Sequence, residues 1–301
     1  MDLVLVVDKP SGLTSHDVVG RLRRSTGVRR IGHAGTLDPG ATGVLVVLVG
    51  KATRLSAFLM ETQKAYRGRI VLGVTTDTQD ADGRVTATRP VGDLDEGTIR
   101  AALAEFTGDL EQVPPMTSAI KRDGTPLYEL ARKGIVVERD PRPVTVESFD
   151  LLSYEPPEIA FEMTCSKGTY VRTLAADVGE RLGPGAHLGR LERTRVGRFS
   201  IEDAAPLSEL EALGRGVHEA GYSMFDALSS WRAVLLDERL AETVMFGGAV
   251  RIGAPELAGV AEGDHVRLTR DGTSLLAVGL VGCRDTVGSA EVRPVRVFEA
   301  L

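Results

Sequence analysis

The order of strand-like and helix-like segments limits the fold of this chain more than any other feature. Apolar runs, continuous or alternating with polar residues, predict β-strands at residues 3–7, 44–49, 64–74, 143–152, 158–166 and 188–199, the last of these a basic extended segment. Amphipathic patterns predict helices at residues 15–24, 94–106, 126–133 and 170–182. Because strands and helices do not alternate regularly, we expect an α+β fold with a mixed sheet rather than a doubly wound one.

Turn and cap residues support these limits. Thr14 or Ser15 is expected to begin the first helix, and Gly27 lies where it should end. The pair Asp123-Gly124 predicts a hairpin turn, because both residue types tolerate the backbone angles of tight turns.

The pattern of predicted elements changes after about residue 230. A predicted helix at 238–246 is followed by short strands separated by glycines, near Val250, Val266, Leu275 and Val292. This pattern predicts a small β-barrel-like domain. We therefore expect one domain over residues 1–230 and a second over residues 231–301.

Cysteine usage and hydropathy restrict the class of protein. Cys165 and Cys283 lie far apart in the 301-residue chain, which supports neither a disulfide framework nor a zinc site. The apolar run 3–7 follows the acidic Asp2 and lacks the basic flank and the length of a signal peptide. No apolar stretch approaches the roughly 20 residues that cross a bilayer, so we expect a cytoplasmic protein without a membrane partner.

The net charge of -6 conceals two basic segments. Residues 1–70 hold 11 Lys and Arg against 5 Asp and Glu, a balance of +6, and residues 165–198 hold 7 against 3, a balance of +4. Such segments are typical of nucleic-acid contacts, but they also occur as solvated helix faces. Charge alone leaves both interpretations open.

Residues 32–43, Gly-His-Ala-Gly-Thr-Leu-Asp-Pro-Gly-Ala-Thr-Gly, form a glycine-rich loop between apolar segments. Glycine permits unusual backbone angles and close approach of a ligand, and Pro39 restricts the backbone directly after Asp38. A carboxylate in such a loop is a candidate catalyst. Asp-Pro pairs are also frequent in ordinary turns, so the residues alone leave a structural role open.

Several separated motifs stand out along the chain. They are Asp8-Lys9-Pro10-Ser11-Gly12-Leu13-Thr14-Ser15, the loop 32–43, Lys64-Ala65-Tyr66, the segment 76–83, the segment 114–121 and Ser166-Lys167-Gly168-Thr169-Tyr170-Val171-Arg172-Thr173. Together these motifs resemble the bacterial TruB family of pseudouridine synthases. The resemblance covers residues 3 to about 200 densely and weakens towards the C-terminus.

The resemblance implies both a fold and a reaction. The fold is a mixed, mainly antiparallel pseudouridine-synthase sheet flanked by helices, with a small C-terminal PUA-like β domain that binds RNA. The reaction converts uridine 55 in the T loop of tRNA into pseudouridine after the base is flipped out. Such an isomerisation needs no cofactor and no metal. We expect a monomer whose partner is the tRNA T stem-loop, and a role as a tRNA-folding chaperone is the alternative.

By the same resemblance, Asp38 is the catalytic carboxylate, Arg172 its counter-ion and Tyr66 an active-site tyrosine. A buried carboxylate stays ionised only if a cation or hydrogen bonds favour the charged form, and a guanidinium can bind it through two parallel hydrogen bonds. Without the motifs, Arg172 would be assigned to a helix surface and Tyr66 to core packing. Tyr66 is expected to act as a base or to stack on the uridine.

Further residues are expected to bind the substrate. Tyr170 and Leu191 would line the pocket of the flipped uridine, because an aromatic face offsets lost base stacking. His33 would fill the gap that the base leaves in the RNA, although a general base or a structural loop histidine are alternatives. Arg54, Asp80 and Lys167 match family positions close to the RNA or the active site. Phosphate contacts are expected from Arg21, Arg23, Arg24, Arg29, Arg30, Lys51, Arg190, Arg193 and Arg195.

Overall fold

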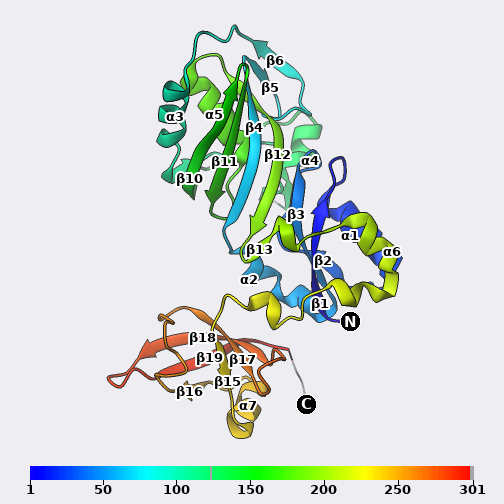
Figure 1. The fold of residues 1–301 in the computed structure, drawn as a ribbon, viewed down its shortest axis with the longest axis vertical. Coiled ribbons are helices and arrows are strands. Elements are labelled where there is room, and N and C mark those ends of the chain that lie inside the picture. The colour runs from blue at the N-terminus through cyan, green and yellow to red at the C-terminus, as the bar shows by residue number, and fades with distance from the viewer. Residues whose placement is uncertain (123, 299–301) are drawn as a thin grey trace.

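The computed structural model describes residues 1–122 and 124–298, and two main β-sheets dominate it (Figure 1). The larger sheet has ten strands, eight of which form a continuous path. In order across the sheet these are β14 (Ala205–Pro206), β1 (Leu3–Lys9), β3 (Thr42–Val49), β12 (Ala186–Val196), β4 (Lys64–Leu72), β11 (Glu158–Cys165), β10 (Arg142–Glu155) and β7 (Gly108–Gln112). The short strands β2 (Ile31–His33) and β13 (Phe199–Ser200) pair with β3 and β12.

Pairing in this sheet is mixed but mainly antiparallel, which confirms the expected fold class. Only the β1–β14 and β3–β12 pairs are parallel among the described strands of this sheet. The β12 strand lies between β3 and β4. Its Arg193 is opposite Gly43 of β3 on one side and opposite Tyr66 of β4 on the other. That position brings a late segment of the chain against the glycine-rich loop, which leads directly into β3.

Helices flank the large sheet as expected. The α1 helix (Ser15–Thr26) begins with a capping box, in which Thr14 and Asp17 bond each other's backbone N–H, and it is capped at its end by Gly27. The β1 and β3 strands bury Leu5 and Leu45 in one core with Leu22 of α1. The remaining helices are α2 (Ser56–Met60), α3 (Glu96–Glu105), α4 (Leu127–Arg132), α5 (Val171–Leu182), α6 (Leu207–Leu213) and α7 (Glu238–Met245).

A second apolar core lies between α3, α5 and the strands β4, β10, β11 and β12. Ile99 of α3 and Val178 of α5 are fully buried in it together with Phe161 of β11. Because α5 begins at Val171, this packing fixes the position of Arg172 in the first turn of the helix.

The predicted strand 64–74 is wrong at its end. The β4 strand stops at Leu72, and β5 (Val74–Thr76) forms a separate hairpin with β6 (Val85–Thr88). Gly73 interrupts the extended backbone, because its φ of 83° lies in the left-handed region that favours glycine. The hairpin places residues 77–84 against β12, where Asp80 bridges to Leu188.

The expected turn at Asp123-Gly124 falls partly outside the described residues, because Asp123 is not among them. The short strands on either side, β8 (Lys121–Arg122) and β9 (Thr125–Pro126), pair antiparallel.

The smaller sheet has five strands, in the order β15 (Ala233–Leu235), β17 (His265–Thr269), β18 (Ala277–Arg284), β19 (Ala290–Val297) and β16 (Val250–Ile252). The strands predicted near Val250, Val266 and Val292 are present, whereas β18 begins two residues beyond Leu275. Figure 1 shows this sheet as a separate layer below the larger one, next to α2. None of the described helices is long and apolar enough to cross a membrane.

Candidate active site

Polar side chains of the N-terminal segment bind the backbone of the loop that carries Asp38. The Ser15 hydroxyl at the start of α1 donates to the Leu37 carbonyl at 3.0 Å and accepts from the Leu37 N–H at 2.8 Å. The buried Lys9 ammonium donates to the carbonyls of Pro39, Pro10 and Leu13. Leu37 is buried in the core with Tyr66 and Leu191. This anchoring fixes the backbone on both sides of Asp38.

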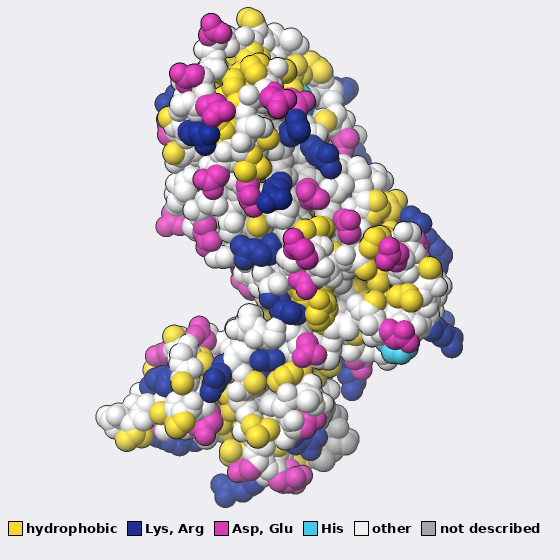
Figure 2. Space-filling view, in the orientation of Figure 1, with side chains coloured by type: hydrophobic (Ala, Val, Ile, Leu, Met, Phe, Trp, Pro, Cys, Tyr) yellow, Lys and Arg dark blue, Asp and Glu magenta, His cyan; other side chains and the backbone are white. Residues whose placement is uncertain are grey.

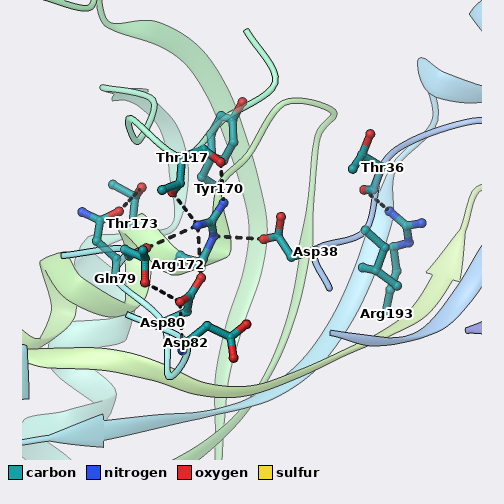
Figure 3. A network of polar contacts seen from close by, with 12 residues as sticks. Thr36, Asp38, Gln79, Asp80, Asp82, Thr117, Tyr170, Arg172, Thr173 and Arg193 are labelled. Carbon is teal, nitrogen blue, oxygen red and sulfur yellow. Dashed lines mark hydrogen bonds and ion pairs between the residues drawn. The ribbon is translucent and has the colours of Figure 1, made fainter. Parts of the chain in front are cut away.

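Asp38 and Arg172 form an ion pair, as expected from the sequence. The Arg172 Nε lies 2.9 Å from Asp38 Oδ2, and Figure 3 shows the two side chains pointing toward each other. The guanidinium also contacts Asp80, with Nη1 3.1 Å from Asp80 Oδ2. One arginine therefore joins a carboxylate of the glycine-rich loop to a carboxylate of the β5–β6 hairpin.

The Arg172 guanidinium is held by further contacts on the side away from Asp38. Its Nη1 donates to the Thr117 hydroxyl at 2.7 Å and to the Thr78 carbonyl at 3.3 Å. Asp80 in turn accepts hydrogen bonds from the Thr78 hydroxyl and the Asp82 N–H. Arg172 is 5% exposed, while the Asp38 side chain is 41% exposed. The cation is thus enclosed and oriented, and the carboxylate remains accessible to a substrate.

Opposing effects set the protonation of Asp38. Desolvation is the largest effect and raises the pKa of Asp38 above its usual value, and the charge of Asp80 raises it further. The charges of Arg172, Arg193 and Lys9 lower it. The net direction is upward. The two arginines and the lysine therefore counteract the tendency of this carboxyl group to hold its proton, and this counteraction is required if the ionised form is the reactive one.

Tyr66 lies on β4 beside this centre. It is 7% exposed, opposite Met163 on one side and Arg193 on the other. Burial raises the pKa of the Tyr66 phenol, and the charge of Arg193 partly opposes that rise. The phenol is therefore protonated at neutral pH.

Two further predicted residues lie close to the centre. Tyr170 directly precedes α5, where its backbone N–H donates to the Gln112 amide oxygen at 2.7 Å and its carbonyl accepts from the Gln112 amide at 3.1 Å. Burial raises the pKa of the Tyr170 phenol above its usual value. Leu191 is buried in the same core as Tyr66.

His33 is the last residue of β2 and the second residue of the loop 32–43. Its Nδ1 is enclosed and has no hydrogen-bond partner among the described residues. Desolvation, and then the charges of Arg193 and His16, lower the pKa of His33. The ring is therefore neutral near pH 7.

Lys167 and Arg54 lie outside this group of residues. The Lys167 side chain is 55% exposed and pairs with Glu61. The Arg54 guanidinium lies 5.1 Å from the centre of the Phe298 ring, at the junction with the smaller sheet. The structure therefore brings Asp38, Asp80 and Arg172 together and leaves these two cations elsewhere.

Arg193 differs from its expected role in contacting phosphate. It is 1% exposed, and its guanidinium donates to the carbonyls of Val44, Thr36 and Gly35. The sequence predicts only a basic extended segment at residues 188–199, which does not indicate which of its arginines is buried. Thr117 and Lys9 are two other residues at this centre for which the sequence predicted no individual role, although both lie within motifs that carried the resemblance.

Basic side chains do not form an unbroken stripe on the face shown in Figure 2. Lys and Arg alternate there with Asp and Glu over the strands of the large sheet. Arg67 and Arg69 of β4 are paired with Glu162 and Glu158 of β11. Part of the positive balance of residues 1–70 is therefore neutralised locally.

The fold and the sequence are both similar to those of known proteins. Among solved structures, one chain of a Cbf5-Nop10-Gar1 complex shares 28% identity with a TM-score of 0.77, covering 99% of this chain and 85% of that one. A chain of an H/ACA RNP bound to a substrate RNA containing 2'-deoxyuridine gives 25% identity and a TM-score of 0.74 with the same coverage. Residues 23–171 match the model of the N-terminal domain of TruB family pseudouridylate synthases. The fold and the site therefore define a pseudouridylate synthase.

Family membership follows from further matches. Residues 172–235 match the C-terminal domain of tRNA pseudouridylate synthase B. The tRNA pseudouridine synthase B of Opitutus terrae is 56% identical over 213 residues, which is 71% of this chain and 88% of the relative. That of Burkholderia pseudomallei is 47% identical over 282 residues, 92% of each protein. The chain belongs to the TruB family.

Proposed function

We propose that this protein isomerises uridine to pseudouridine in tRNA, at position 55 of the T loop, with Asp38 as the catalytic carboxylate. The ion pair between Asp38 of the loop 32–43 and Arg172 of α5 is the observation that carries the proposal. The relatives named tRNA pseudouridine synthase B support tRNA as the substrate.

The reaction breaks the bond between N1 of uracil and C1' of ribose and forms a bond between C5 and C1'. The C5 proton leaves and a proton returns to N1, so that no atom is gained or lost. Asp38 in its ionised form attacks the sugar or the base, or stabilises the charge that develops on the separated sugar. Arg172 lowers the pKa of that carboxylate against the larger upward effect of desolvation, and it would hold the carboxylate toward the substrate.

Tyr66 is the group we assign to the reacting base. Its ring would provide a surface against which a flipped uracil stacks, and its phenol would take part in proton transfer at C5. Leu191 and Tyr170 would complete the walls of the pocket, and Asp80 would set the orientation of Arg172 through their ion pair. His33 would occupy the space that the uridine leaves in the T loop.

Contacts with the rest of the RNA are assigned to exposed cations and to the C-terminal sheet. Lys167, Arg54 and the basic residues of α1 would lie along the phosphates. Residues 1–230 would carry the chemistry and residues 231–301 would form a PUA-like RNA-binding domain. We propose that the protein acts as a monomer in the cytoplasm and uses no cofactor.

The test compares Asp38→Asn with Asp150→Asn, which removes an exposed carboxylate from β10. Release of tritium from [5-³H]uridine in transcribed tRNA reports turnover, and reverse-transcription mapping reports the position. We expect no turnover from Asp38→Asn, unchanged turnover from Asp150→Asn and a signal at position 55 alone. Undiminished pseudouridine formation by Asp38→Asn would refute the assignment. Accelerated tRNA folding by that variant would indicate the additional chaperone role.

A further inference from the structure

Arg193 connects both ends of the Asp38 loop to the centre of the large sheet. Its Nη2 and Nη1 donate to the carbonyls of Gly35 and Thr36, at 3.2 and 3.1 Å, before Asp38 in the chain. Its Nε donates to the Val44 carbonyl at 2.8 Å, after Asp38. Figure 3 shows this guanidinium beside Thr36, apart from the Arg172 cluster. One side chain of β12 thus fixes the start and the exit of the loop.

The charge of Arg193 is not neutralised by a carboxylate. No Asp or Glu of residues 1–122 and 124–298 forms an ion pair with it, and its three hydrogen bonds all go to carbonyl groups. A buried guanidinium without a counter-ion is costly, because carbonyl dipoles replace only part of its lost hydration. A neutral side chain of similar length would avoid that cost, so the positive charge requires an explanation beyond packing.

The neighbouring ionisable groups supply this explanation. Arg193 lowers the pKa of Asp38 and the pKa of Tyr66, in each case against the larger upward effect of burial. Arg172 contacts Asp38 directly, whereas Arg193 reaches it through the loop backbone and through space. The two arginines therefore act on the same carboxylate from different sides of the loop.

We propose that Arg193 is a positioning residue that fixes the Asp38 loop in its reactive geometry and places a permanent positive charge at the backbone of the loop that carries the catalytic carboxylate. The proposal rests on the function assigned to Asp38 above. A guanidinium suits both tasks, because it remains charged at every accessible pH and its planar fork serves several carbonyls at once. Lysine keeps the charge, but its donors all lie on one nitrogen, whereas Nε, Nη1 and Nη2 of Arg193 each bond a different carbonyl. Methionine keeps the length but has neither property.

The test uses Arg193→Met and Arg193→Lys with two controls. Ile99→Ala removes a fully buried side chain from α3, away from the loop, and reproduces a loss of stability. Arg181→Met removes an exposed arginine that pairs with Glu105. The measurements are the NMR titration of the Asp38 carboxyl carbon, the single-turnover rate on tRNA from pH 5 to 9, tRNA affinity and thermal unfolding.

We expect Arg193→Met to raise the pKa of Asp38 and move the acidic limb of the rate profile to higher pH, by roughly one unit, which is about tenfold in rate below the limb. Arg193→Lys should leave the limb in place and lower the plateau rate. Affinity for tRNA should be unchanged in both variants, and neither control should move the limb.

An unchanged Asp38 titration in Arg193→Met, or a loss of rate no larger than that of Ile99→Ala, would overturn the proposal. If Arg193→Met does not fold, an Arg193→Lys plateau equal to the wild-type plateau would overturn it instead. The NMR titration needs no turnover. A wild-type protein that forms no pseudouridine would therefore refute the proposed function and still leave the effect of Arg193 on Asp38 measurable.

Discussion

Replacing Gly43 with alanine should damage the protein at the point where the Asp38 loop enters β3. Gly43 has a φ of 95°, and a Cβ built there would lie 2.3 Å from the Arg193 carbonyl oxygen and 3.0 Å from its carbonyl carbon and nitrogen. These are backbone atoms, so no side-chain rotation can relieve the contact. The β3 and β12 strands must separate, which weakens their parallel pairing at Thr42 and Gly43.

The magnitude follows from two contributions. An L-residue in the left-handed region costs about 1–2 kcal/mol. Moving β12 away from Gly43 also weakens the hydrogen bonds of Arg193 to the loop carbonyls, and each such bond to a charged group contributes about 1.5–3 kcal/mol. Because the loop relaxes in part, we expect a total loss of about 3–5 kcal/mol in the free energy of unfolding.

Gly108→Ala is the matched control. Gly108 has a φ of 100°, and no atom lies within 4 Å of a Cβ placed there. It should therefore lose only the backbone contribution of about 1–2 kcal/mol. Urea denaturation of both variants measures the difference, and tRNA turnover at a temperature where both are folded measures the effect on the site. Equal destabilisation of the two variants, or wild-type turnover by Gly43→Ala, would refute the reasoning.

Other perturbations test the remaining parts of the site. Arg172→Met removes the cation that pairs with Asp38, so the pKa of the Asp38 carboxyl should rise further. The acidic limb of the rate profile should move to higher pH by about 1–2 units, because a charge-assisted bond contributes about 1.5–3 kcal/mol. A lower affinity for tRNA with an unmoved limb would contradict this. Tyr66→Phe should lose turnover and retain tRNA binding in a filter assay, whereas weak binding with normal turnover per bound tRNA would point to a binding role. The double change Arg29→Ala and Lys51→Ala, at exposed positions of the first basic segment, should reduce the slope of log affinity against log salt by about 1–2; an unaltered slope would exclude both as phosphate contacts.

Sequence reasoning was effective where the determinants are local. The expected start at Thr14 or Ser15 and the expected end near Gly27 match α1, and the strands expected over residues 143–152 and 158–166 are present as β10 and β11. The single strand expected over 64–74 was wrong, because one glycine with a positive φ divides it. Apolar pattern alone does not reveal such a break.

The site was predictable only to the extent that motifs reveal it. The Asp38–Arg172 pair was expected from the family resemblance and is confirmed as a contact, whereas the roles of these residues stay predictions. The contact between Asp80 and Arg172 joins segments 92 residues apart, which no local pattern encodes. The sequence does not distinguish Arg193 from the less buried Arg190 and Arg195 of the same strand. Arg193 is buried because β12 lies between β3 and β4.

That insertion has a consequence for the synthesis of the protein. The hydrogen bonds from Arg193 to Thr36 and Val44 span 157 and 149 residues, so the N-terminal part of a growing chain lacks the groups that shape its own catalytic loop. On the ribosome, β1 and β3 can pair early, but the central gap in the sheet stays open until residues 186–196 have emerged. Contacts of such long range fold slowly. A truncated or prematurely released chain would therefore carry Asp38 without a competent site, and an unfilled strand position would invite aggregation.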